Sequence, residues 1–180
     1  MKKIKFILSS LCLTILSSVT LTVTAANVGD VIGQVLKTDI VTRIDKTDIR
    51  SYNINNFTAI VAEDLLQYGF DVVWNPSNRT LSVTKAENKA ITSTYKATKA
   101  YPQEIGMPAG DVIYSDIKTY INGQLTASFN IGGVTCIYAH ALQEAGYGTL
   151  SFDNTSRLLT IAISQKSHKY DDKALPLIDL

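Results

Sequence analysis

The sequence predicts an α+β fold of two tandem modules, each a curved antiparallel sheet (hairpin–helix–hairpin) packed on one short helix. Three observations lead to this fold class. The chain repeats itself at a spacing of 77 residues. In each copy, alternating apolar residues beside turn residues predict hairpins. Between the hairpins, a short stretch of helical spacing ends at a glycine.

The chain begins with a predicted signal peptide, residues 1–25. Three lysines precede an apolar run at 6–23, and small residues follow, so we expect cleavage after Ala25 or one residue later. A retained membrane anchor is the alternative. It is less favoured because Ser and Thr residues interrupt the run, and a stable span needs about 20 predominantly apolar residues. We therefore predict a secreted, extracytoplasmic protein. Association with the cell wall is one such location.

Charge and cysteine content narrow the function classes. The chain has 17 Lys and Arg against 16 Asp and Glu, and removing the three lysines of the signal peptide leaves 14 against 16. A slightly acidic chain predicts no nucleic-acid partner and no membrane partner after signal removal. Cys12 would leave with the signal, so Cys136 has no partner for a disulfide. The fold must therefore depend on a hydrophobic core.

The internal repeat defines the predicted modules. Fifteen residues of the stretch Gly29–Gly69 are identical to those 77 positions later, without a gap. One inserted residue then moves the offset to 78, where Arg79 aligns with Arg157. This tandem duplication predicts a first module at 27–84 and a second at 104–164.

The first hairpin of each copy is predicted from its turn. In the second copy, residues 117–121 alternate like a strand and Asn122-Gly123 follows, a strong hairpin signal because both residues tolerate positive φ. The first copy has Asp45-Lys46 at this place, which is a weaker turn.

A helix and a second hairpin complete each predicted module. Val61, Leu65 and Leu66 fall at helical spacing, and Gly69 supplies the stop, as Gly146 does in the second copy. The second hairpin is predicted from strands on either side of two turns, 75–78 and 153–156.

Two segments lie outside the modules. Residues 85–103 are rich in Lys, Ala and Thr and predict a linker, with room for one helical turn. Residues 165–180 form a charged and then apolar tail, which either docks on a module or frays. Because modules of about 55 to 65 residues are marginal alone, we expect packing between the copies, although the linker also allows independent units.

The residues of each copy carry a resemblance to a known family. Residues 58–83, TAIVAEDLLQYGFDVVWNPSNRTLSV, resemble the copper amine oxidase N-terminal-like domain, or stalk domain. The segments TDIVTRIDKTDIRSYNINN and SDIKTYINGQLTASFNIGG are similar to its opening hairpin. Val61 and Tyr138 depart from a proline of the family pattern, and Asn75 departs from an aspartate. The resemblance covers essentially the mature chain, once per copy.

The resemblance implies little about activity. In the amine oxidases this module is a peripheral appendage, and the copper and quinone sites belong to another domain. The resemblance therefore implies tandem extracytoplasmic modules of bacterial surface or secreted proteins, without copper chemistry.

The inventory of reactive residues agrees with a non-catalytic protein. We predict no enzyme activity, no metal site and no cofactor, because a metal site needs several converging His, Cys or carboxylate ligands. His140 is interpreted as a surface histidine, and Cys136, aligned with Ala59, as a small core residue. Asp39 and Asp116 recur in equivalent positions of separate modules, which favours a turn role over an acid–base pair.

Aromatic residues are the remaining candidates for binding. We name Trp74, Tyr120, Tyr68 and Tyr147 as candidate ligand-binding residues, with Tyr120 the best candidate for exposure. The sequence thus predicts a non-catalytic cell-envelope module that binds cell-wall polysaccharide or serves as a surface spacer. The alternative is a protein–protein interaction module that binds another envelope protein through sheet edges or the apolar tail.

Overall fold

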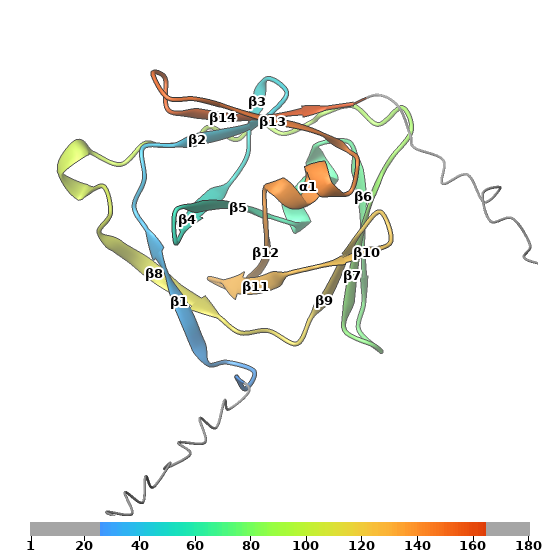
Figure 1. Cartoon of the computed structure of the whole chain (residues 1–180). Coiled ribbons are helices and arrows are strands. Elements are labelled where there is room, and N and C mark those ends of the chain that lie inside the picture. The colour runs from blue at the N-terminus through green and yellow to red at the C-terminus, as the bar shows by residue number, and fades with distance from the viewer. Residues whose placement is uncertain (1–25, 165–180) are drawn as a thin grey trace, which may run out of the picture.

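The computed structural model describes residues 26–164 (Figure 1). The predicted signal peptide, 1–25, and the predicted tail, 165–180, lie outside the described residues. The first repeat contains β1 (Val31–Leu36), β2 (Val41–Ile44), β3 (Thr47–Asp48), β4 (Ser51–Ile54), β5 (Phe57–Val61), the 3-10 helix η1 (Glu63–Gln67), β6 (Phe70–Asn75) and β7 (Thr80–Lys85). The second contains η2 (Pro102–Glu104), β8 (Pro108–Ile113), β9 (Lys118–Ile121), β10 (Gln124–Thr126), β11 (Ser128–Ile131), β12 (Val134–Tyr138), α1 (His140–Glu144), β13 (Gly148–Asp153) and β14 (Leu158–Ile163).

The turns that the sequence predicts are confirmed. Asn122 and Gly123 have φ of 52° and 78° and join β9 to β10, and Asp45 has φ of 53° between β2 and β3. Gly69 and Gly146, also at positive φ, follow the two short helices. The left-handed conformation is accessible to glycine and to Asn or Asp at low cost, so these residue types fix where each strand or helix ends.

A closed six-stranded barrel joins the two repeats. Its strand order is β1-β4-β5-β12-β11-β8, with three strands from each repeat. The repeats meet at two antiparallel pairs, β1 with β8 and β5 with β12. Each repeat therefore supplies half of the barrel, and neither half closes alone.

Two four-stranded sheets flank the barrel, and each combines hairpins from both repeats (Figure 1). In one sheet, ordered β10-β9-β7-β6, β7 of the first repeat pairs in parallel with β9 of the second. In the other, ordered β13-β14-β2-β3, β14 of the second repeat pairs in parallel with β2 of the first. The second hairpin of each repeat thus extends the first hairpin of the other.

The predicted fold class is wrong. The described residues are mostly β-strand, in several sheets, rather than two α+β modules with one helix filling each sheet. The physical reason lies in the length of the helices. Both η1 and α1 have five residues, and Leu65 is the one buried residue of η1. So short a helix cannot cover the apolar face of a sheet. The apolar faces are buried instead where the two flanking sheets, each built from both repeats, pack on the barrel wall.

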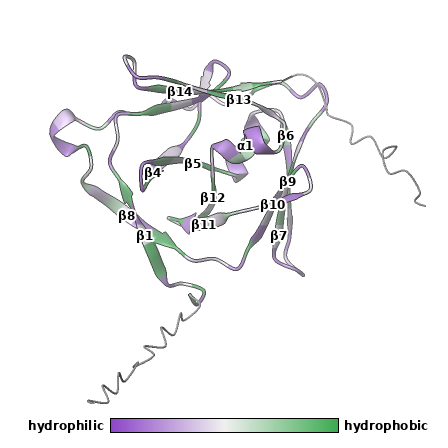
Figure 2. Cartoon of the chain, in the orientation of Figure 1, coloured by the Kyte–Doolittle hydropathy of each residue, from purple (hydrophilic) through white to green (hydrophobic). Residues whose placement is uncertain are grey.

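Two hydrophobic clusters form the core. Alternate residues of the barrel strands, among them Val35, Phe129 and Cys136, fill the barrel interior. The outward-facing Ile60 and Ile137 belong to the second cluster, which packs the barrel wall against the two helices and both flanking sheets. Figure 2 shows apolar stretches along β1, β8 and β14, with polar residues interspersed in other strands. The alternation with period two follows from the strand geometry.

Candidate functional site

The structure separates the four aromatic residues that the sequence singles out. Tyr68 and Tyr147 are buried in the core between barrel and sheets, and burial raises the pKa of both phenols. Trp74 lies on the edge strand β6 and is 43% exposed, while Tyr120 is half-buried on β9. Trp74 is in register with the buried Leu81 and Thr119, whereas Tyr120 is in register with Ser82 and Val73. The two candidates therefore lie on opposite faces of the sheet and do not form one surface.

Tyr120 lies in a row of side chains on the outer face of its sheet. Cross-strand register aligns Val73, Ser82, Tyr120 and Leu125 on β6, β7, β9 and β10. In the other flanking sheet, the repeat-related row contains Ser151, Thr160, Arg43 and Asp48. There the Arg43 guanidinium donates to the Asp48 carboxylate at 2.6 Å. The row with Tyr120 therefore has aliphatic side chains at both ends, Val73 and Leu125, whereas its counterpart contains an ion pair.

A cluster that sequence analysis missed lies at one end of the barrel. Phe57, Phe129, Tyr138 and His140 form this aromatic cluster. The imidazole of His140 stacks on the Tyr138 ring, with centroids 5.3 Å apart and an angle of 9°. Phe57 meets both rings edge-on, at 5.7 Å from Tyr138 and 6.1 Å from His140.

The local sequence explains how these rings meet. Asn55 and Asn56 both have positive φ in the tight turn between β4 and β5, and the Asn53 side chain accepts from the main-chain N–H of Asn56 at 3.2 Å. Phe57 leaves this turn 56% exposed. Opposite Tyr138 in the β5–β12 register stands Ala59, whose small side chain leaves room for the Tyr138 ring.

The opposite end of the barrel has different chemistry. The repeat-related positions of Phe57, Tyr138 and His140 are Val134, Val61 and Glu63. There the Glu63 carboxylate accepts from the main-chain N–H of Thr135 at 2.8 Å. Nearby, Arg50 donates twice to Asp64, at 2.7 and 2.5 Å, which raises the pKa of the guanidinium. The aromatic cluster is thus specific to one end of a nearly symmetric barrel.

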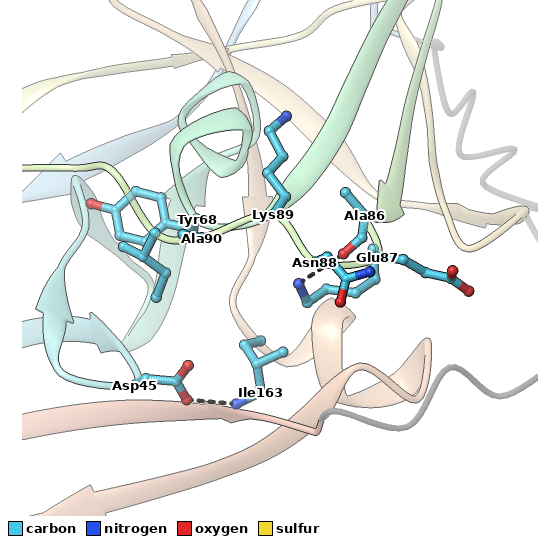
Figure 3. Close-up of a pocket in the computed structure, with 10 residues that line it drawn as sticks. Asp45, Tyr68, Ala86, Glu87, Asn88, Lys89, Ala90 and Ile163 are labelled. Atoms are coloured by element: carbon cyan, nitrogen blue, oxygen red, sulfur yellow. Dashed lines mark hydrogen bonds between the residues drawn. The ribbon is translucent and has the colours of Figure 1, made fainter.

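A cavity of about 560 Å³ lies where the linker passes the end of β14 (Figure 3). It is lined by Asp45, Tyr68, Ile163 and residues 85–91. Three of its four charged side chains have partners: the Asp45 carboxylate accepts from the N–H of Ile163 at 2.9 Å, Lys85 Nζ donates to the carbonyl of Gly69 at 2.7 Å, and Lys89 Nζ donates to the carbonyl of Phe70 at 2.8 Å. Figure 3 shows Glu87 and Lys89 pointing in different directions, so the cavity does not gather charges around one point.

The described reactive groups occupy structural positions. Cys136 is fully buried in the barrel, and burial, followed by the charge of Glu63, raises the pKa of its thiol to about 12. Asp39 and Asp116 each accept from an arginine of the other repeat, Arg157 and Arg79 respectively. Within residues 26–164, no group of three or more His, Cys, Asp or Glu side chains is arranged to hold a metal ion.

Among the described residues, no helix has the length and apolar character needed to cross a membrane.

The chain matches no protein-family model, no curated protein and no solved structure. The resemblance to the copper amine oxidase N-terminal-like domain accordingly stays a prediction that rests on the residues quoted above.

Proposed function

We propose that the protein is a non-catalytic module of the cell envelope that binds cell-wall glycan at the aromatic cluster. The observation that carries the proposal is the convergence of Phe57, Tyr138 and His140, with Phe57 more than half exposed. Aromatic rings offer apolar faces on which the C–H face of a sugar ring packs. His140 and the exposed side chains of Asn55 and Asn56 add donors and acceptors for its hydroxyl groups.

The exposure of Phe57 supports a binding role over a packing role. A phenyl ring with over half its surface in water contributes little to the core, so its position needs another explanation than burial. Its counterpart at the other barrel end is the half-buried Val134, which shows that the fold does not require an aromatic residue there.

Co-sedimentation tests this proposal. We would incubate the chain from Ala26 onward with peptidoglycan sacculi and wall polysaccharides and measure the retained protein against its concentration. Saturable retention is expected, and Phe57→Ala should weaken it by roughly fivefold or more, equivalent to about 1 kcal/mol. Val134→Ala is the matched control, because it changes the repeat-related position, and it should bind like the parent protein.

Two outcomes would contradict the proposal. Absence of retention at high protein concentration would remove glycan binding and leave a spacer role. Retention lost in Trp74→Ala or Tyr120→Ala but kept in Phe57→Ala would place binding on the β10-β9-β7-β6 sheet instead.

One observation favours protein–protein interaction as a second candidate. The edge strand β6 carries two exposed apolar side chains, Val73 and Trp74, and among the described residues no strand pairs with its outer side. Exposed edges of this kind accept an added strand from a partner. If this candidate is right, Val73→Lys should abolish capture of an envelope protein, whereas Ser151→Lys, at the related position of β13, should not.

A further inference from the structure

The two repeats continue differently after their last strands, and the first continuation defines a path. From the end of β7, the linker passes β3 and reaches β8 (Figure 1). The N–H of Ala86 donates to the carbonyl of Gly69, and further along the N–H of Ala97 donates to the Asp48 carboxylate at 3.1 Å. The linker ends its path where the N–H of Ala100 donates to the carbonyl of Thr38.

This path seals the edge of the β13-β14-β2-β3 sheet. The Tyr68 hydroxyl donates to the main-chain carbonyl of Asp48 and shares a 2.8 Å hydrogen bond with the Ser93 hydroxyl. As a result, Asp48 on β3 is only 6% exposed. The edge of β3 is therefore protected by a polar segment that meets polar side chains.

The repeat-related edge lacks this protection within the described residues. β10 is the counterpart of β3, and no described strand pairs with its outer side. Leu125, the counterpart of Asp48, is 65% exposed, and Ala145 stands where Tyr68 stands in the first repeat. The second edge thus offers an apolar surface where the first offers a carboxylate and a phenol.

The chain leaves β14 in the same way as it leaves β7. The N–H of Ser164 donates to the carbonyl of Tyr147 at 3.0 Å, much as the N–H of Ala86 donates to the carbonyl of Gly69, although Gly69 aligns with Gly146, the residue before Tyr147. The segment 164–180 is also one residue longer than the linker segment 86–101, so it has the length to follow the related path.

We propose that the C-terminal segment 165–180 docks along the free edge of β10 and covers Leu125, as the linker covers Asp48 at the edge of β3. At the offset of 78, Leu175 takes the place of Ala97 and reaches Leu125, and Ile178 takes the place of Ala100. The apolar end of the segment, ALPLIDL, matches the apolar edge, just as the polar linker matches the polar one. This inference is independent of glycan binding, because it concerns β10 and not the aromatic cluster.

Disulfide trapping in the full-length chain tests the docking. We would prepare a variant with Leu125→Cys and Leu175→Cys, and a control with Lys46→Cys and Leu175→Cys, which places the first cysteine at the hairpin of the other sheet. Mild oxidation should give an intramolecular disulfide in the first variant at several times the yield of the control. Equal yields, or a disulfide that forms only between chains, would overturn the proposal.

Hydrogen exchange provides a second measurement that does not depend on cysteines. In the full chain, the amides of β10 should exchange at least several times more slowly than in a variant with Leu175→Ser, Leu177→Ser and Ile178→Ser. The amides of β3 serve as the internal reference, because the linker covers them in both proteins. Unchanged exchange of β10 between the two proteins would show that the tail does not protect this edge and would overturn the proposal.

Discussion

Arg79 of the first repeat and Asp116 of the second form a two-pronged ion pair, with N–O distances of 2.8 and 2.6 Å. The related pair, Arg157 with Asp39, joins the repeats in the opposite direction at 3.1 Å. Both arginines have positive φ at the turns of the second hairpins, which aims them at the other repeat. The recurring Asp residues are thus explained by the interlocking of the repeats.

The Arg157–Asp39 pair should contribute a small, salt-sensitive coupling to stability. A double-mutant cycle with Arg157→Ala and Asp39→Asn is expected to give about 0.2–1 kcal/mol in urea unfolding, because both groups are partly solvated. The coupling should shrink as NaCl is added. A cycle that combines Arg157→Ala with Asp116→Asn, two residues in different pairs, should give a coupling near zero. A coupling of equal size in both cycles would contradict a direct interaction.

Acid should weaken the sealed edge of β3. Burial alone would raise the pKa of the Asp48 carboxyl, but hydrogen bonds from Arg43 and the N–H of Ala97 outweigh burial and lower it below 3.8. A depressed pKa in the folded state contributes stability above about pH 4 that is lost as the pH falls through the folded value. Urea midpoints measured from pH 6 to pH 2 should therefore fall less steeply for Asp48→Asn than for the parent. Parallel curves would show that Asp48 gains nothing from its partners.

The Cys136 thiol should be unreactive in the folded protein. Its pKa is raised to about 12 and its side chain is buried, so almost no accessible thiolate exists near pH 8. A thiol reagent should leave Cys136 of the native chain from Ala26 unmodified during the time in which it modifies the urea-unfolded chain completely. Tyr101→Cys in a Cys136→Ala background, at a position 69% exposed, is the reactive control. Reaction of native Cys136 at the rate of this control would contradict the buried placement.

Separated repeats should not fold as monomers. Residues 26–101 contain β2, β5 and β7 but lack the strands that pair with them, β14, β12 and β9. Residues 102–180 contain these three partner strands but lack β2, β5 and β7. We expect each half alone to show no cooperative monomeric unfolding, and the mixed halves to regain the circular dichroism spectrum of the intact chain. A half that unfolds cooperatively as a monomer would contradict the interlocked fold.

Local structure was predictable from the sequence, whereas the pairing between repeats was not. Asn122-Gly123 and the helix-ending Gly69 act through backbone conformation at the residue itself, so they can be identified without tertiary information. The partners of β7 and β14 depend on which sheet buries the most apolar surface, and a hairpin pattern fits either repeat equally well. This ambiguity is why two separate α+β modules were predicted.

The candidate site was missed for the same reason. Phe57 lies in the first repeat, 81 residues before Tyr138, and Tyr138 and His140 lie together in the second, so no local motif joins Phe57 to the other two rings. One signal was available: at aligned positions the second repeat has Tyr138 and His140 where the first has Val61 and Glu63. A change from aliphatic and acidic to aromatic residues at related positions is a difference that the shared fold does not require.

NMR spectroscopy of the chain from Ala26 with soluble peptidoglycan fragments tests glycan binding at the aromatic cluster most directly. The ring resonances of Phe57, Tyr138 and His140 should shift together and saturate with one dissociation constant, while those of Trp74 and Tyr120 stay in place. Saturable shifts at Trp74 or Tyr120 with an unmoved Phe57, or no shifts at all, would contradict the account.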